Sequence, residues 1–269
     1  MGDPIEHSRS PAIHTAALAA AGIEGTYLAR RVAPGELGRI FEELRSGALD
    51  GINVTMPHKP EAARLCDELS DDARRSSSVN TVVRIGGGRL IGHSTDVTAI
   101  RRLWRNRLPT DHPVLVLGAG GAASAACIAA QGRTVYVSAR RDGAIKALQR
   151  HLDRQIVAVP WGSAVAEAVV VNATPLGMHG EHLPAPLLTL AAGFLDLAYG
   201  EAATPSVAQA RSAGLDVVDG LEVLVTQAAD SFRLWTGQEA TLEVMYRTAR
   251  NYSRQSNSAP NEMIDGEGL

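Results

Sequence analysis

A glycine-rich segment in the middle of the chain has the spacing of a dinucleotide-binding turn. The apolar run Val114-Leu115-Val116-Leu117 precedes Gly118-Ala119-Gly120-Gly121-Ala122-Ala123, which has the pattern G-x-G-x-x-A and leads into an alanine-rich run. Glycines here allow a tight turn and let a pyrophosphate approach the backbone, while the following helix offers free N–H groups to the anion. Because the flanking runs predict a strand and a helix, the pattern favours dinucleotide binding over an ordinary glycine turn.

The dipeptide Arg140-Arg141 lies where the second strand of such a unit is expected to end. A site for NAD carries Asp or Glu there, about 20 residues after the glycines, to bind the ribose 2′-hydroxyl. Guanidinium groups can instead bind a 2′-phosphate through paired hydrogen bonds. A solvated basic turn is the alternative interpretation, and the balance favours NADP.

The first half of the chain contains four motifs that are more polar than their surroundings require. They are His7-Ser8-Arg9-Ser10-Pro11, Asn53-Val54-Thr55 with Pro57-His58-Lys59, Val79-Asn80-Thr81, and Gly92-His93-Ser94-Thr95-Asp96. Each has an ordinary interpretation alone: Ser10 or Asp96 could cap a helix, and Lys59 could be an exposed lysine. Together they supply hydroxyls, amides, one amine and one carboxylate, a set that suits a small polyhydroxylated substrate.

Hydrophobic periodicity indicates the elements that must position these motifs. The first half predicts helices over 11–21, 35–46, 61–69 and 97–107, a strand at 52–55, and a hairpin of 79–85 with 89–91. From residue 114 the chain predicts strands at 114–117, 134–138, 156–159, 169–172, 194–197 and 216–218, with helices at 121–131, 142–153, 163–167 and 205–213. This alternation predicts parallel βαβ units. Helices at 221–235 and 239–250 follow, and the polar tail 253–269 is expected to be disordered.

Composition narrows the class of protein. The 269 residues are 45% hydrophobic and 20% charged, with a net charge of -3, which excludes a disordered chain, a collagen or a coiled coil and argues against nucleic-acid binding. Cys66 and Cys127 are too few for a disulfide framework, so a reducing cytoplasm is expected. The N-terminal residues are not expected to act as a signal peptide, and the uncharged stretch 113–132 fits a strand, a turn and a helix better than a membrane span. His179-Gly-Glu181-His182 is more typical of a solvated turn than of a metal site.

Taken in order, the motifs resemble the shikimate dehydrogenase family, which reduces 3-dehydroshikimate to shikimate with NADPH. The resemblance runs from residue 2 to about 250 and also includes Asn172-Ala-Thr-Pro-Leu-Gly-Met178, Asp196 with Tyr199, and Leu224-Val-Thr-Gln-Ala228. It implies an α/β fold with an N-terminal α/β substrate domain (1–96 with 221–252) and a Rossmann-type NADP-binding domain (97–220). A C-terminal helix pair would return to the first domain. It also implies a cytoplasmic enzyme, a monomer or homodimer, with a small shikimate-like substrate and no nucleic-acid or membrane partner.

The resemblance further implies a role for each matching residue. Lys59 and Asp96 would be the catalytic pair, and Ser8 and Ser10 would hold the substrate carboxylate. Thr55, Asn80, Tyr199 and Gln227 would bind hydroxyls or the carboxylate. The cofactor residues would be Gly118, Ala119, Gly120, Gly121 and Ala122 at the pyrophosphate, Arg140 and Arg141 at the adenosine phosphate, and Asn172, Thr174 and Met178 along the nicotinamide.

Some positions depart from the family pattern. Thr15 and Ser94 stand where the family has amide-bearing residues, and Glu222 stands where it has glycine. Two alternatives therefore remain: a relative acting on quinate, aminoshikimate or another cyclitol carboxylate, and a non-catalytic nucleotide-binding paralogue. The small hydroxyl of Ser10 favours shikimate over quinate.

Overall fold

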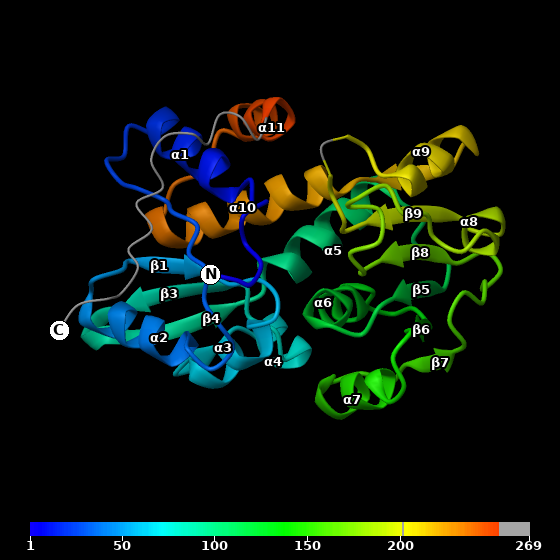
Figure 1. The fold of residues 1–269 in the computed structure, drawn as a ribbon, viewed down its shortest axis with the longest axis horizontal. Coiled ribbons are helices and arrows are strands. Elements are labelled where there is room, and N and C mark those ends of the chain that lie inside the picture. The colour runs from blue at the N-terminus through cyan, green and yellow to red at the C-terminus, as the bar shows by residue number, and fades with distance from the viewer. Residues whose placement is uncertain (201, 253–269) are drawn as a thin grey trace.

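The computed structural model describes residues 1–200 and 202–252, which form two sheets in adjacent halves of the molecule (Figure 1). One half contains a four-stranded sheet and the other a six-stranded sheet. The long helices α5 (Thr95–Arg107) and α10 (Gly220–Thr236) lie between the two halves and pack against each other. They are the elements through which the chain passes from one half to the other.

The first half is a small mixed sheet with helices packed on it. Its elements are α1 (Ser10–Ala20), α2 (Leu37–Ser46), β1 (Gly51–Asn53), α3 (Lys59–Leu65), β2 (Glu68–Leu69), α4 (Asp71–Ser76), β3 (Thr81–Ile85), a 3-10 turn (Gly86–Gly88) and β4 (Arg89–His93). The strand order is β1-β3-β4-β2, with β3 antiparallel to both neighbours and β2 parallel to β4. The apolar face of α2 (Leu37, Ile40, Phe41 and Leu44) is buried in the same core as Val82 and Leu90 of the sheet.

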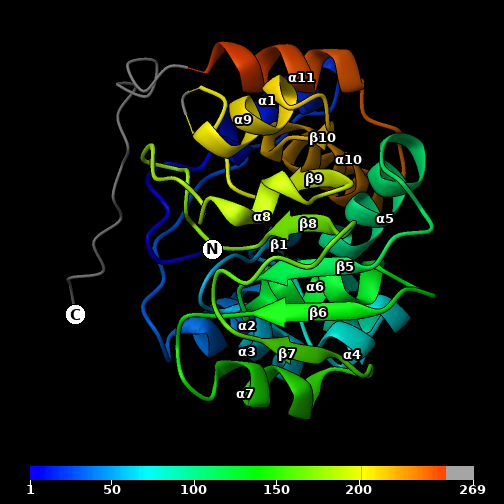
Figure 2. The same cartoon turned by 90° about the vertical axis from the view of Figure 1, so that its right-hand side faces the viewer.

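The second half is an all-parallel, doubly wound sheet. Its elements are β5 (Val114–Leu117), α6 (Gly121–Ala129), β6 (Val135–Ser138), α7 (Ala144–His151), β7 (Val157–Val159), β8 (Val169–Asn172), α8 (Pro186–Thr189), β9 (Gly193–Asp196), α9 (Pro205–Ser212) and β10 (Asp216–Val218). The order β10-β9-β8-β5-β6-β7 is visible along the sheet in Figure 2. It is the Rossmann order, and it reverses between β5 and β8, where open α/β sheets bind ligands. The predicted α/β class and Rossmann-type domain are therefore confirmed.

The C-terminal helices α10 and α11 (Leu242–Asn251) pack on α1 in the first half. Ile13 of α1, Phe232 of α10 and Met245 of α11 share one buried cluster. By contrast, Ile100 and Trp104 of α5 are buried in the core of the six-stranded half. Helix α5 is thus built into the second half, while α10 is built mainly into the first.

The structure corrects several predicted elements. The helix predicted over 61–69 ends at Leu65, because residues 67–70 hydrogen-bond to β4 instead, and α4 follows as a helix the periodicity did not predict. No helix forms at 163–167, where no side chain is fully buried, whereas the unpredicted α8 begins with Pro186 and buries Leu187 and Leu188. The helix predicted from residue 97 begins at Thr95, which places Asp96 in its first turn rather than at its cap.

The predicted disordered tail, 253–269, lies outside the described residues. Among the helices of the described ranges, none combines the length and apolar character needed to cross a membrane.

Candidate active site

Two charged residues from different helices meet between the halves. Lys59 is the first residue of α3 and Asp96 lies in the first turn of α5. The Lys59 Nζ atom lies 2.5 Å from Asp96 Oδ2, and each side chain is 15% exposed. An acidic side chain is favoured at a helix N-terminus, so the first turn of α5 is a suitable place for Asp96. The structure therefore brings together the two residues expected to form the catalytic pair.

Asn80, Thr95 and Gln227 form a polar cluster that is joined to this pair through Thr95, the residue before Asp96. The Asn80 amide donates to Thr95 Oγ1 (2.8 Å) and to Gln227 Oε1 (3.2 Å), and its Oδ1 accepts from the Thr95 backbone N–H (2.7 Å). These contacts tie the loop before β3, the start of α5 and the middle of α10 together. Asp96 follows Thr95 immediately, so the cluster also fixes the position of the Asp96 backbone from which the carboxylate extends.

Sequence reasoning missed three members of the wider network. The Asn53 amide donates to the Asn80 carbonyl (3.0 Å) and to Ser231 Oγ (3.1 Å), while Tyr27 donates its hydroxyl hydrogen to Asn53 Oδ1 (2.8 Å). Asn53 stood in a motif already singled out but received no role. Ser231 lies one helical turn after Gln227, which was an available signal. Nothing in the local sequence pointed to Tyr27.

Three of the other residues expected at the substrate lie near the start of α1 and in the loop after β9. Ser10 begins α1, and its backbone N–H donates to Ser8 Oγ (3.3 Å). Burial raises the pKa of the Tyr27 hydroxyl, and a hydrogen bond with the Ser10 side chain opposes that rise, so Ser10 also lies beside the network. Tyr199, from the loop after β9, is partly buried against the cluster that contains Ile13 and Leu224.

Thr55 is partly buried in the segment after β1, and its backbone N–H donates to the Met1 carbonyl (2.9 Å). No hydrogen bond in the described part of the chain joins the Thr55 side chain to the Asn80 cluster.

The glycine turn connects β5 to α6 at the point where strand order reverses. Gly118 has φ +110°, and a Cβ there would lie 2.7 Å from the Ala173 carbonyl oxygen, so only glycine fits. Gly120 precedes α6 and has no side chain that could cap the helix. A Cβ added to Gly120 would have no neighbouring atom within 4 Å, so the space beside it is open. A Cβ on Gly121 would lie 3.3 Å from the Lys59 side chain. The uncapped N-terminus of α6 therefore lies next to the Lys59–Asp96 pair.

The remaining candidate cofactor residues follow the ends of neighbouring strands. Arg140 and Arg141 are exposed after β6. Asn172 ends β8 fully buried, accepts hydrogen bonds from the Thr174 N–H (3.1 Å) and hydroxyl (2.6 Å), and donates to Asp196 Oδ1 (2.9 Å). Asn172 thus shapes the loop that leads to the partly buried Met178, and its own polar atoms are occupied by protein partners.

The departures from the family pattern fall in different environments. Thr15 is exposed on α1, so its side chain stays away from the buried cluster. Ser94 is 2% exposed, and its hydroxyl has no hydrogen-bond partner among the described residues. Glu222 pairs with Arg107 (2.9 Å), which links α10 to α5.

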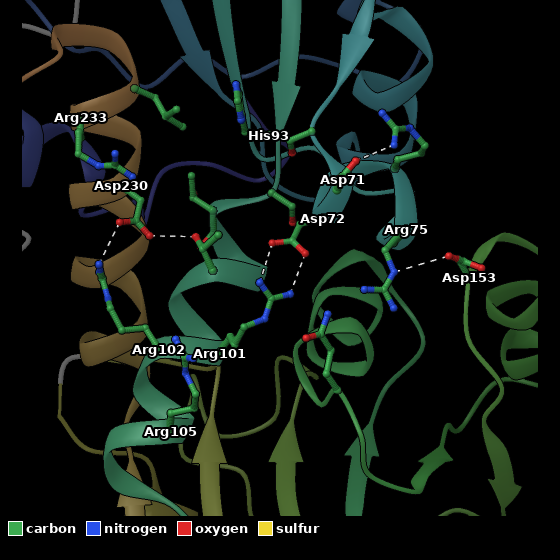
Figure 3. A pocket seen from close by; sticks show the side chains of 17 residues that line it. Asp71, Asp72, Arg75, His93, Arg101, Arg102, Arg105, Asp153, Asp230 and Arg233 are labelled. Carbon is green, nitrogen blue, oxygen red and sulfur yellow. Dashed lines mark hydrogen bonds and ion pairs between the residues drawn. The ribbon is translucent and has the colours of Figure 1, made fainter. Parts of the chain in front are cut away.

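A groove of about 1000 Å³ opens on another side of α5 and is lined by six arginines and four aspartates (Figure 3). Most of these charges neutralise one another. Arg101 binds both carboxylate oxygens of Asp72 (2.7 and 2.9 Å), and Arg102 lies 3.2 Å from Asp230. None of the glycine-turn residues lines the groove. We interpret the groove as a set of ion pairs between the halves rather than as the reaction site.

Comparison with known proteins agrees with this geometry. Residues 1–82 match the model of the shikimate dehydrogenase substrate-binding domain, and residues 220–250 match the model of the shikimate 5'-dehydrogenase C-terminal domain. A shikimate dehydrogenase (NADP(+)) from an Anaeromyxobacter species is 38% identical over 91% of this chain and 92% of its own length. The chain belongs to the shikimate dehydrogenase family.

Solved structures of the shikimate dehydrogenase family superpose closely on this chain. A shikimate 5-dehydrogenase from Thermus thermophilus in complex with NADP(H) and shikimate has a TM-score of 0.81 and 36% identity, covering 93% of this chain and 96% of its own. A quinate dehydrogenase from Corynebacterium glutamicum in complex with NAD has a TM-score of 0.80 at 29% identity, covering 92% and 95%. Because the two scores are nearly equal, side chains rather than the fold must distinguish substrate and cofactor within the family.

Proposed function

We propose that this protein is an NADP-dependent shikimate dehydrogenase, which interconverts 3-dehydroshikimate and shikimate. The observation that carries the proposal is the Lys59–Asp96 pair at 2.5 Å, placed beside the uncapped glycine turn and the Asn80–Gln227 cluster. The shikimate dehydrogenases among its relatives, at 35–38% identity over most of the chain, support the same activity.

The residues present fit the dinucleotide. The N-terminus of α6 has no side-chain cap, and the space around Gly120 is open, so backbone N–H groups are available to a pyrophosphate. After β6 the chain continues with Ala139, Arg140 and Arg141, so the first charged groups beyond the strand are guanidiniums rather than the carboxylate that would hold a ribose 2′-hydroxyl. Their charge suits the 2′-phosphate of NADP. When bound, the nicotinamide supplies the hydride chemistry.

Lys59 would handle the proton that accompanies this chemistry. In the reducing direction its ammonium group donates a proton to the carbonyl oxygen of 3-dehydroshikimate, and in the oxidising direction the neutral amine accepts the hydroxyl proton. Asp96 accepts a hydrogen bond from the Lys59 ammonium and holds it in place. Holding a catalytic group in the right geometry lowers the barrier to the reaction.

The substrate would be held by uncharged polar groups. Ser8 and Ser10 would bind its carboxylate at the start of α1, while Thr55, Asn80, Tyr199 and Gln227 would bind its hydroxyls. Asn80 and Gln227 already bond to each other, so they present a preorganised pair.

The two halves of the molecule would bind different ligands. Residues 1–96 with 221–252 would form the substrate domain and residues 97–220 the cofactor domain. Both cysteines, Cys66 and Cys127, are free thiols, which fits a cytoplasmic enzyme.

A spectrophotometric assay tests the proposal. Purified full-length protein with shikimate and NADP+ should produce NADPH, followed at 340 nm, and quinate and aminoshikimate should be turned over with lower kcat/KM. If shikimate is inert while quinate or aminoshikimate is oxidised, the assigned substrate is wrong. If none of the three is oxidised while NADP+ still binds, the protein is a nucleotide-binding paralogue.

A further inference from the structure

Arg140 and Trp161 leave neighbouring strands at the same distance along the sheet. Strand β6 pairs in parallel with β7, with Ser138 opposite Val159. Arg140 and Trp161 each lie two residues beyond this pair, so both emerge at the same edge. The guanidinium carbon of Arg140 lies over the Trp161 ring, 5.7 Å from its centre. This distance is within the range of a cation–π contact.

The ring is the fixed partner in this contact. Trp161 is partly buried and packs against the cluster that contains Leu117, Leu183 and Leu187. The backbone before it is held as well, because Ser138 donates its hydroxyl hydrogen to the Pro160 carbonyl (2.9 Å). One side of the ring therefore faces the core, and the other is available to the arginine.

Arg140 is exposed and has few alternatives to this contact. Within the described ranges no carboxylate lies within ion-pair distance of Arg140, and no hydrogen bond holds its guanidinium. Arg141 is exposed too but has no ring contact in the same part of the chain. A long arginine side chain loses rotamer freedom when it binds an anion, and a prior contact reduces that loss. The two arginines are therefore not equivalent.

We propose that Trp161 is a positioning residue that holds Arg140 ready for the 2′-phosphate of the cofactor and so increases selectivity for NADP over NAD. The inference rests on the proposed function, since it takes Arg140 as the phosphate ligand. Trp161 contacts none of the reacting atoms, so it acts on cofactor binding and leaves the chemical step alone.

Calorimetric titration of the full-length protein with NADP+ and with NAD+ tests this role. Trp161→Leu should raise the Kd for NADP+ about fivefold, the scale of one cation–π contact, and leave the Kd for NAD+ unchanged. Trp161→Phe should raise it less, because a phenyl ring retains a weaker contact. Val157→Ala is the matched control: Val157 is 46% exposed on β7, so this variant changes the same edge strand but not the ring.

A double-mutant cycle separates positioning from general support of the fold. Once Arg140→Ala has removed the cation, adding Trp161→Leu should weaken NADP+ binding no further. The proposal would be overturned if the two substitutions weakened NADP+ binding additively. It would also be overturned if Trp161→Leu weakened NADP+ and NAD+ binding equally, because the ring would then act on a part of the dinucleotide that both cofactors share. If Trp161→Leu does not fold, the same test is made with Trp161→Phe, by comparing its Kd for NADP+ with its Kd for NAD+.

The outcomes also distinguish this inference from the proposed function. If the wild-type protein prefers NADP+ and Trp161→Leu has the same preference, only the proposed role of Trp161 is contradicted. A wild-type protein that does not oxidise shikimate contradicts the proposed activity, whatever the ring does.

Discussion

Lys59 can be tested against a natural control, because the chain has one other lysine, Lys146. We expect Lys59→Ala to lower kcat for shikimate oxidation by about 10²–10⁴-fold, the usual loss when general acid–base help is removed. The KM for shikimate should change much less, since other groups hold the substrate. Steady-state kinetics with NADP+ measure both quantities.

Lys146 is exposed on α7, far from the pair in sequence, and Lys146→Ala should keep wild-type kinetics. A Lys59→Ala enzyme with kcat within threefold of wild type would remove Lys59 from the chemical step.

Asp196 makes a separate prediction about pH. It is fully buried at the end of β9, and burial raises the pKa of its carboxyl from 3.8 to about 6, against three hydrogen bonds that favour the charged form. Because the folded pKa lies above the unfolded one, this group contributes most stability below about pH 4 and loses that contribution as pH rises through about 6. The loss amounts to about 3 kcal/mol for a shift of this size.

The measurement compares wild type with Asp196→Asn by urea denaturation between pH 4.5 and pH 8. Stability of the wild type relative to the variant should fall as pH rises to about 7 and then level off. A difference that stays constant over this range would show that the Asp196 carboxyl does not titrate there.

At the scale of elements, the bidentate Arg101–Asp72 pair should matter more than a similar pair nearby. It joins α5 to α4 with side chains only 25% and 18% exposed (Figure 3). We expect Arg101→Ala to destabilise the protein by about 1 kcal/mol. Arg74→Ala, which breaks the Arg74–Asp71 pair exposed at 64% and 88%, should have no measurable effect.

Urea midpoints at low and high salt check both variants. Equal shifts for the two would mean that the groove contributes nothing beyond ordinary surface charge.

The second half of the fold was predictable because its signals are local. An apolar strand, a glycine turn and an alanine-rich helix follow one another within 16 residues of chain at 114–129, and the structure has them as β5 and α6. The prediction failed where long-range pairing decided the outcome. Local periodicity predicts helix as far as residue 69, but the backbone N–H groups of Asp67 and Ser70 bond to β4, which no local pattern reveals.

In the candidate site, too, residues in sequence motifs were predictable and residues defined by long-range contacts were not. Motif order indicated Lys59, Asp96, Asn80 and Gln227, and the structure places them in direct pairs. Tyr27 was not predicted, because its role is defined by a contact with Asn53 across the fold. Ser231 was not predicted either, although its position one helical turn after Gln227 was a signal; its contacts with Asn53 and Thr81 appear only in the folded chain.

At the scale of the whole molecule, we expect the two halves to close on ligands, with hinges near the start of α5 and near Gly220. The proposed substrate-binding groups come mainly from the first half and the proposed cofactor-binding groups from the second, so binding of both should draw the halves together. Small-angle scattering of the protein with NADP+ and shikimate together should give a smaller radius of gyration than the free protein. Identical profiles in the two states would contradict closure.

The position of Asp96 at the very start of α5 has a mechanical consequence. In a rotation, an atom moves in proportion to its distance from the axis. Thr95 is bonded to Asn80 of the first half, so an axis near this point leaves the Lys59–Asp96 contact almost still. Arg140 follows β6 in the six-stranded half, so it moves with that half. Opening the molecule would therefore move the proposed cofactor-binding residues of the second half away from the first half, while the proposed proton-transfer pair stays assembled for the next turnover.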